Sequence, residues 1–337
     1  MTPPAPRPWL GPLGSAFAAL AAARVGLHRS GLLRPARLSG PVVSVGNLSL
    51  GGSGKTPVVA WIAERLAREG VPVAVLSRGY AGRFAGDALV VSDGSRIDAD
   101  AAECGDEPLM LARRLPGVVV AVGRQRLLAG RAVEARFGRR LHVLDDGFQH
   151  LALHRDLDVV CLDPADLDDR PLPAGRLRER PAALARADVV LIGGELREPA
   201  RLLALGVAAE RVHRMRRRPA ALLDAAGAAV TPTDPVLLLS GIARPERFAA
   251  DARAFGLQVA GHASFADHHA FSPAELAAVE AQARALGATL VVATEKDAAR
   301  LSGARLGLPV AALRLELTVD GEERLLERLR ELARGLA

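Results

Sequence analysis

The sequence predicts an α/β fold, with a mostly parallel sheet that has helices on both faces and a second, smaller α/β domain. The main observation is that short apolar runs alternate with helical patterns from Pro41 onward, as in successive βαβ units. A glycine-rich loop directly follows the first of these runs. Half of the 337 residues are apolar, which is enough for one large or two moderate cores and excludes intrinsic disorder of the whole chain.

Changes in composition along the chain predict four segments. These are an N-terminal basic amphipathic arm (1–40), a phosphate-loop domain (41–210), a connector (211–234) and a C-terminal α/β domain (235–337). The connector is predicted because 211–219 is basic and 225–235 is small, polar and proline-containing. Strands are expected at 42–45, 73–76, 118–122, 141–144, 157–162, 189–192, 236–239, 258–260, 289–293 and 310–315. Helices are expected to begin near Lys55, Asp106, Arg124 and Pro181, and to cover 245–255, 273–286 and 321–334.

The basic excess of the chain, +6 in formal charge, belongs to the N-terminal arm. Its 40 residues contain five arginines and no acidic residue. Positions 9–23 carry no charge, but they are too few to span a bilayer, and a strand follows too soon for a cleaved signal peptide. We therefore expect a helix in the membrane interface, with Trp9, Leu13, Phe17 and Leu20 in the lipid. The alternative is an ordinary amphipathic helix packed on the body of the protein.

Composition disfavours two other classes of protein. Aromatic residues make up 3% of the chain and the basic excess does not lie over the folded domains, so nucleic-acid binding is not expected. The two cysteines, Cys104 and Cys161, lack the neighbours of a zinc site and are too few for a disulfide framework. This cysteine usage indicates a reducing compartment.

Residues 49–56 are close to the phosphate-binding loop G-x-x-x-x-G-K-[ST] and predict a P-loop NTPase-like domain. In that loop backbone N–H groups bind phosphates, the lysine reaches the β- and γ-phosphates, and the hydroxyl residue holds Mg²⁺. Ser49 occupies the first glycine position, so we expect Gly51 and Gly52 to supply the backbone freedom and a Ser49→Gly change to be nearly neutral. Lys55 is one of only two lysines among 44 basic residues. The predicted nucleotide-binding residues are Ser49, Leu50, Gly51, Gly52, Ser53, Gly54, Lys55 and Thr56.

A second predicted strand ends in paired carboxylates. The run 141–144 is largely apolar and leads into Asp145 and Asp146, as in a Walker-B strand whose acids hold Mg²⁺ directly or through water. Open α/β sheets bind ligands beyond the carboxyl ends of their strands, so we expect these acids beside Lys55 and Thr56. In other contexts, paired acids at a strand end are often a solvated turn or a helix cap.

Several motifs in one order resemble the tetraacyldisaccharide 4'-kinase family, the lipid A 4'-kinases of Gram-negative bacteria. They lie at 46–57, 77–80, 105–108, 145–150, 172–175, 241–248, 267–269 and 294–297. The resemblance implies ATP- and Mg²⁺-dependent phosphorylation of the 4'-hydroxyl of a tetraacylated glucosamine disaccharide 1-phosphate. It also implies a peripheral or monotopic enzyme at the cytoplasmic face of the inner membrane, which binds an anionic lipid and needs no obligate protein partner.

The resemblance further implies roles for individual residues. Asp106 becomes the candidate general base and Glu107 a candidate Mg²⁺ ligand, although Asp106 alone is more simply interpreted as a helix cap. His268 is expected to orient Asp106 by closing the second domain over the first, with His269 as an alternative. Candidate substrate residues, for which structural salt bridges are the alternative, are Arg78, Tyr80, Arg124, Arg126, Gln149 and His150. The role of Lys296 stays open.

Two other function classes share the phosphate loop. One is a membrane-peripheral P-loop ATPase that acts as a switch on a protein partner, and the other is a ligase-like enzyme that activates a carboxylate with ATP. Neither requires Asp106 or His268. A guanine-reading N-K-x-D motif is absent, but 294–297 is a looser T-x-K-D version, so the residues alone leave GTP open.

Overall fold

The computed structural model describes residues 8–51, 54–80, 82–232, 234–301 and 306–336, and its centre is a twelve-stranded sheet. The predicted Gly52 and Ser53 lie outside the described residues. The strands are β1 (Val42–Gly46), β2 (Val73–Ser77), β3 (Leu89–Ser92), β4 (Val119–Val122), β5 (Leu141–Asp145), β6 (Leu157–Leu162), β7 (Val189–Gly193), β8 (Val212–Leu223), β9 (Val236–Ser240), β10 (Val259–Ser264), β11 (Leu290–Thr294) and β12 (Val310–Val319).

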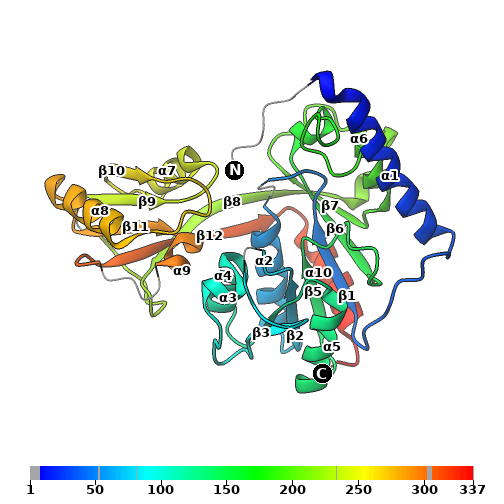
Figure 1. Ribbon diagram of the computed structural model, residues 1–337, viewed down its shortest axis with the longest axis horizontal. Coiled ribbons are helices and arrows are strands. Elements are labelled where there is room, and N and C mark those ends of the chain that lie inside the picture. Colours follow the sequence, from blue (N-terminus) through cyan, green and yellow to red (C-terminus); the bar gives the residue numbers. More distant parts are fainter. Residues whose placement is uncertain (1–7, 52–53, 81, 233, 302–305, 337) are drawn as a thin grey trace.

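The strand order is β10-β9-β11-β12-β8-β7-β6-β1-β5-β2-β4-β3. Within the described residues, neighbouring strands are parallel except in the β12–β8 and β3–β4 pairs. We call the part built on β1–β7 the large half and the part built on β9–β11 the small half; β8 and β12 run through both (Figure 1). The predicted α/β fold with a mostly parallel sheet is confirmed.

Helices cover both faces of each half. They are α1 (Gly11–Arg29), α2 (Lys55–Arg68), α3 (Ala101–Cys104), α4 (Asp106–Arg114), α5 (Arg126–Phe137), α6 (Ala200–Ala204), α7 (Pro245–Ala254), α8 (Pro273–Ala285), α9 (Glu295–Arg300) and α10 (Glu322–Ala333). Short 3₁₀ turns occupy Pro8–Leu10, Pro164–Leu167, Pro181–Arg186 and Ala209–Arg211. Strands buried on both faces are continuous apolar runs, which is why the sequence located most of them.

The faces of β1 show how the core is divided. Val43 and Val45 pack with α2, α4 and α10, whereas Val42 packs on the opposite face with α5. In the small half, alternate residues of β9 face α7 and α8 in the same way. The sheet is therefore a middle layer, and its strand ends are the edges open to ligands.

The segment 211–234, predicted as a connector, contains strand β8. This strand pairs with β7 in the large half and with β12 along most of its length. Arg214, Arg216, Arg217 and Arg218 are exposed along β8, in which Met215 and Leu222 are the buried residues. A strand without a buried apolar face lacks the alternating pattern that sequence analysis relies on, and this explains why β8 was missed. The short edge strand β3 was also missed. Near Pro181 the expected helix is only a 3₁₀ turn.

The C-terminal segment 235–337 does not pack as one unit. Leu325, Leu326 and Leu329 of α10 are buried in the core of the large half, together with Leu317 and Val319 of β12. Glu322 of α10 pairs with Arg65 of α2, and Arg328 of α10 pairs with Asp188 before β7, so α10 lies in the large half (Figure 1). The chain therefore leaves the large half, builds the small half and returns.

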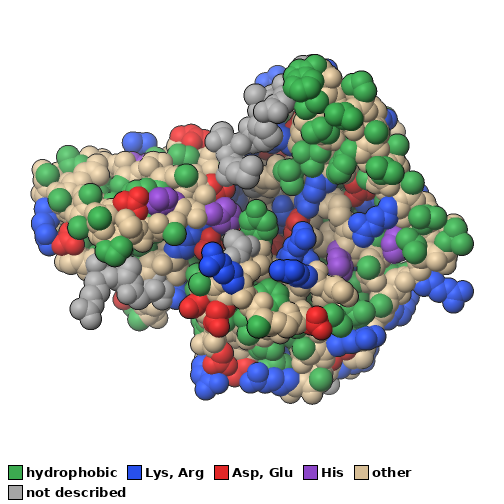
Figure 2. All heavy atoms as spheres, viewed as in Figure 1, with side chains coloured by type: hydrophobic (Ala, Val, Ile, Leu, Met, Phe, Trp, Pro, Cys, Tyr) green, Lys and Arg blue, Asp and Glu red, His purple; other side chains and the backbone are tan. Residues whose placement is uncertain are grey.

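Helix α1 lies along the outside of the large half (Figure 1). Its small residues Gly14 and Ala18 are buried, and a Cβ at Gly14 would lie 2.9 Å from the carbonyl oxygen of Pro171. Large apolar side chains on and next to α1 stay exposed and are visible over it in Figure 2; they include Trp9, Leu13, Phe17 and Leu20. In the described part of the chain, no helix combines the length and apolar character that crossing a bilayer requires.

Candidate active site

The phosphate loop joins the end of β1 to α2. Gly54 has φ +87° and caps α2, and Lys55 is the first residue of that helix, with Thr56 in the same turn. Lys55 Nζ lies 3.1 Å from Asn47 Oδ1 and 3.6 Å from Asp146 Oδ1. The loop thus presents a helix N-terminus and an ammonium group at the carboxyl ends of parallel strands, where anions bind.

Ser49 and Leu50 hold the loop to a neighbouring segment. Ser49 is buried and its hydroxyl donates to Asp166 Oδ2 at 2.9 Å, while the Leu50 amide donates to the Arg176 carbonyl at 2.8 Å. The side chain of Ser49 therefore braces the loop from within the protein. This contact was not foreseen in the expectation that Ser49→Gly is nearly neutral.

Asp145 and Asp146 lie at the end of β5, beside the loop as expected. Asp145 is buried, and burial together with the charges of Glu107 and Asp146 raises its pKa. For Asp146, burial is outweighed by a hydrogen bond from Arg178 and by the charge of Lys55, which hold its pKa well below the usual range. Asp146 also has φ +57°, a left-handed conformation that aspartate tolerates better than most residues.

Arg178 is a residue of this site that sequence reasoning missed. Its two terminal nitrogens each lie 2.8 Å from a different oxygen of Asp146, and it also donates to Asn47 Oδ1. A bidentate guanidinium fixes both the position and the plane of a carboxylate. Arg178 follows the 172–175 motif closely, which was the available signal.

A second cluster forms around Asp106 at the start of α4. His268 Nδ1 lies 3.0 Å from Asp106 Oδ2, and Arg300 Nε donates to the same oxygen at 2.7 Å. Burial alone would raise the pKa of Asp106, but hydrogen bonds from His268 and Arg300, with the charges of Arg300 and Lys296, lower it to about 2. Asp106 is therefore an ionised carboxylate held between α4 and the small half.

Arg300 and Lys296 bring α9 into this cluster. Lys296 Nζ lies 3.1 Å from His268 Nε2 and 3.9 Å from Glu107 Oε1. Lys296 thus connects the Asp106 cluster to Glu107, whose charge raises the pKa of Asp145 at the end of β5. Sequence reasoning missed Arg300 and left Lys296 open. His269, the alternative to His268, is instead paired with Glu275 at 2.9 Å.

The predicted substrate residues divide into two groups, and Arg126 is in the buried one: it is 4% exposed and donates to the Asp145 carbonyl at 3.3 Å. Arg78, Tyr80 and Arg124 are exposed. Gln149 is engaged within the protein, because its amide donates to the Asn47 carbonyl at 3.0 Å and to Glu179 at 3.1 Å. For His150, burial and then the positive charges of four arginines lower the pKa to about 4; these are Arg126, Arg155, Arg24 and Arg78.

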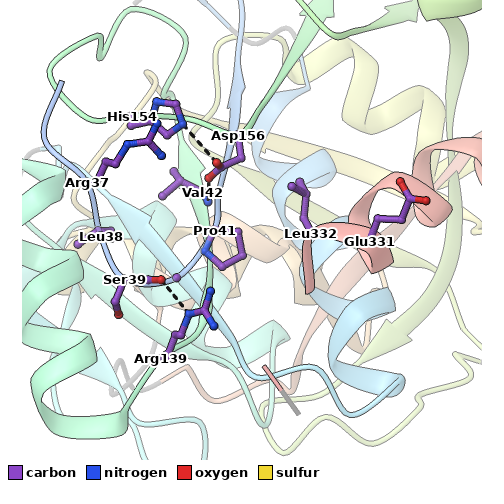
Figure 3. A pocket seen from close by; sticks show the side chains of 11 residues that line it. Arg37, Leu38, Ser39, Pro41, Val42, Arg139, His154, Asp156, Glu331 and Leu332 are labelled. Carbon is purple, nitrogen blue, oxygen red and sulfur yellow. Dashed lines mark hydrogen bonds and ion pairs between the residues drawn. The ribbon is translucent and has the colours of Figure 1, made fainter. Parts of the chain in front are cut away.

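A cavity of about 340 Å³ lies at the opposite edge of the sheet (Figure 3). Its lining includes Pro41 and Val42 at the start of β1, and Leu332 near the end of α10. Inside it, His154 pairs with Asp156 at 3.2 Å. The cavity is separated from Asp106 and Lys55 by the length of the strands, so it is not part of the candidate active site. Among the described residues, no group of three or more His, Cys, Asp or Glu side chains could hold a metal ion by itself.

Comparison with known proteins gives one consistent result. Residues 6–334 match the family model described as tetraacyldisaccharide-1-P 4'-kinase. The tetraacyldisaccharide 4'-kinase of Anaeromyxobacter dehalogenans strain 2CP-C is 45% identical over 319 residues, which are 91% of this chain and 84% of that protein. The enzyme of the same name from Geobacter metallireducens is 40% identical over 307 residues, 87% of this chain and 88% of that protein.

The fold also has a counterpart among solved structures. A crystal structure of LpxK from Aquifex aeolicus, described as an "apo" form in complex with ATP, aligns with a TM-score of 0.80 and 31% sequence identity. The alignment covers 96% of this chain and 98% of the Aquifex chain.

Proposed function

The chain belongs to the tetraacyldisaccharide 4'-kinase family and is a phosphotransferase of lipid A biosynthesis, and from this premise we propose how its residues divide the reaction. The γ-phosphoryl group of ATP passes to the 4'-hydroxyl of a tetraacylated glucosamine disaccharide 1-phosphate. A bond forms between the sugar oxygen and the γ-phosphorus, the bond to the β-phosphate breaks, and the hydroxyl proton goes to Asp106. The switch and ligase classes are set aside by the family membership.

The observation that carries this proposal is the environment of Asp106. Its carboxylate opens α4 and is held ionised by His268 and Arg300, within the site that also contains the phosphate loop. A carboxylate with a pKa of about 2 is a weak base, but phosphoryl transfer needs its base late, when the hydroxyl has become acidic. Fixing the direction of the carboxylate is then more important than raising its basicity.

The phosphate loop and the acids at the end of β5 fit ATP with Mg²⁺. Lys55 is placed for the β- and γ-phosphates, and the backbone of 49–56 for the phosphate oxygens. Asp145 supports a cation site, because burial and neighbouring negative charges raise its pKa. Candidate Mg²⁺ ligands are Thr56, Glu107, Asp145 and Asp146, with phosphate oxygens completing the set. When bound, the ion would neutralise charge on the β- and γ-phosphates.

The basic group around His150 fits the anionic part of the lipid. The charges of Arg24, Arg78 and Arg126 all act on His150. Arg24 and Arg78 are exposed and form this group with His150, whereas Arg126 is buried and holds the Asp145 carbonyl. Arginines bind phosphate oxygens in a bidentate manner, and a histidine beside them becomes a donor when an anion arrives. We assign this group to the 1-phosphate, with Tyr80, Arg124 and Gln149 nearer the sugars.

The arm fits attachment to a membrane surface. Helix α1 is packed through small residues, whereas Leu13 and Leu20 of α1 and Trp9 of the preceding 3₁₀ turn are at least half exposed, at 59%, 73% and 75%. The arginines of the arm suit anionic headgroups. We assign the protein to the cytoplasmic face of the inner membrane, where its acylated substrate and ATP can meet, as a peripheral or monotopic enzyme.

The test of this proposal is single-turnover transfer to the lipid disaccharide at saturating ATP. Asp106→Ala should lower the rate about 10²–10⁴-fold with little change in ATP affinity, which is the usual cost of losing a general base. The matched control is Asp100→Ala, because Asp100 caps α3 through the Glu103 amide and does nothing else in the proposal. If both variants kept wild-type rates, Asp106 would be only a helix cap.

A further inference from the structure

We propose that Lys296 is a positioning residue for phosphoryl transfer, which acts on Asp106 through His268. The inference rests on the proposed role of Asp106 as base and adds to it a residue on α9. In a chain with 44 basic residues, only Lys55 and Lys296 are lysines, and both ammonium groups lie in the site. A lysine offers a compact point charge with rotatable donors, which a planar guanidinium cannot reproduce.

The contacts of Lys296 define the direction of each hydrogen bond. Its Nζ is 3.1 Å from His268 Nε2, and an ammonium group can only donate. Nε2 must therefore accept, and the ring proton must be on Nδ1. His268 Nδ1 lies 3.0 Å from Asp106 Oδ2, and an ionised carboxylate can only accept. Donor and acceptor thus alternate without conflict from Lys296 to Asp106.

This series of hydrogen bonds leaves one oxygen of Asp106 for the substrate. In the described part of the polypeptide, the hydrogen bonds and ion pairs of the Asp106 side chain end on Oδ2, including those from Nε and Nη2 of Arg300 at 2.7 Å. Oδ1 is then the oxygen that faces the 4'-hydroxyl. Lys296 contributes by keeping the His268 ring in the plane where Nδ1 meets Oδ2.

The surroundings of Lys296 and His268 are consistent with a fixed geometry. The side chain of Lys296 is only 16% exposed, and two acids hold its ammonium: Asp267 Oδ1 at 3.5 Å and Glu107 Oε1 at 3.9 Å. His268 has φ +61°, which is uncommon for a residue with a side chain and has to be maintained by its neighbours. The ring of Tyr80 meets the His268 ring edge-on, with centroids 6.0 Å apart.

The first experiment is Lys296→Met, which keeps the length and packing of the side chain but removes the donor. We expect kcat for transfer to the lipid disaccharide to fall about 10- to 100-fold, with the KM for ATP and the unfolding midpoint unchanged. Lys296→Arg should recover only part of the rate. The matched control is Arg113→Met, because Arg113 also joins α4 to α9, through the Ala298 carbonyl, but does not touch His268. Equal losses of kcat in both variants would mean that Lys296 only holds α9 against α4, and this would overturn the inference.

The second experiment removes His268 first. If Lys296 acts through His268, Lys296→Met should cause no further loss in the His268→Ala background, because residues that act as one unit are not additive. A full additional loss would mean that Lys296 acts directly on the transferred phosphoryl group, and the positioning role would be refuted. A slow Asp106→Ala variant beside a normal Lys296→Met variant would refute this role alone, whereas a normal Asp106→Ala variant would refute the proposed base.

A third experiment separates hydrogen bonding from charge. Lys296→Ala leaves space for a small amine, and ethylammonium supplies the N–H donors that the variant lacks. Tetramethylammonium carries the same charge without any donor. Recovery of kcat with ethylammonium alone supports the donor role, and equal recovery with both ions contradicts it.

Discussion

The replacement of Ser49 by glycine tests how the phosphate loop is supported. Glycine is the residue that the phosphate-loop motif expects at this position, so the motif predicts a neutral change. The structure predicts a destabilised protein. Ser49 is 3% exposed, and its hydroxyl donates to Asp166, whose side chain is completely buried. In Ser49→Gly, Asp166 Oδ2 loses this donor at a place that water does not reach.

The magnitude follows from these contacts. A buried polar group that loses its partner costs about 1–3 kcal/mol, and the added backbone freedom of glycine costs about 0.5–1 kcal/mol more. Arg176 still pairs with Asp166 at 3.3 Å, so Asp166 keeps a partner and the lower part of the range applies. We expect Ser49→Gly to lose about 2 kcal/mol in the free energy of unfolding, and Ser49→Ala slightly less.

The cost should also depend on pH. Burial raises the pKa of Asp166 and the Ser49 hydroxyl lowers it, so the variant has a still higher pKa in the folded state. A folded protein that holds its proton more tightly than the unfolded chain loses stability as the pH rises above 3.8, the ordinary pKa of an aspartate. The loss in the free energy of unfolding caused by Ser49→Gly should therefore be small at acidic pH and reach its full size at neutral pH.

Urea unfolding followed by circular dichroism at several pH values measures this difference. The reasoning is wrong if Ser49→Gly stays within about 0.5 kcal/mol of the wild type at pH 7, the usual range of neutral substitutions. It is equally wrong if Ser49→Ala and Asp166→Asn add without coupling, because residues in direct contact should be non-additive.

Three further predictions concern binding. Lys55→Ala should abolish transfer while the fold is kept, which activity and circular dichroism together will show; an active variant would remove Lys55 from the phosphate site. Binding of a phosphorylated disaccharide should raise the pKa of His150 from about 4, so protons are taken up between about pH 4 and 6.5; calorimetry in two buffers measures this uptake, and it should vanish in His150→Gln. Deleting residues 1–36 should weaken binding to anionic vesicles by about 1 kcal/mol per arginine lost and reduce its dependence on salt, as flotation can test.

Sequence patterns predicted the fold best where strands are buried on both faces. The strands of the large half other than the edge strand β3 were located within one or two residues, because their apolar runs are bounded by loops. Strand β8 escaped prediction because Arg216 and Arg218 are exposed and pair with Asp320 and Glu316. Its position depends on which distant strands lie beside it, and this information is not local.

Site residues could be predicted from the sequence where they belong to a recognisable motif. They could not be predicted where a common residue type contacts the site from a distant part of the sequence. Asp106 and His268 were placed through a family resemblance, and the structure brings them into contact. Arg300 was missed, although its spacing of four residues from Lys296 puts both on one face of α9. Among so many arginines, only the tertiary structure distinguishes the one that contacts Asp106.

The return of the polypeptide to the large half affects how the protein folds while the ribosome is still synthesising it. Because α10 follows the whole small half in sequence, a ribosome must translate about 130 residues after β7 before α10 can cover its face of the sheet. Until then, apolar side chains of α2 and β1 that pack with Leu325 and Leu329 are open to chaperones and proteases. The large half therefore cannot complete its core before the small half has been synthesised. Residues 41–210 expressed alone should aggregate.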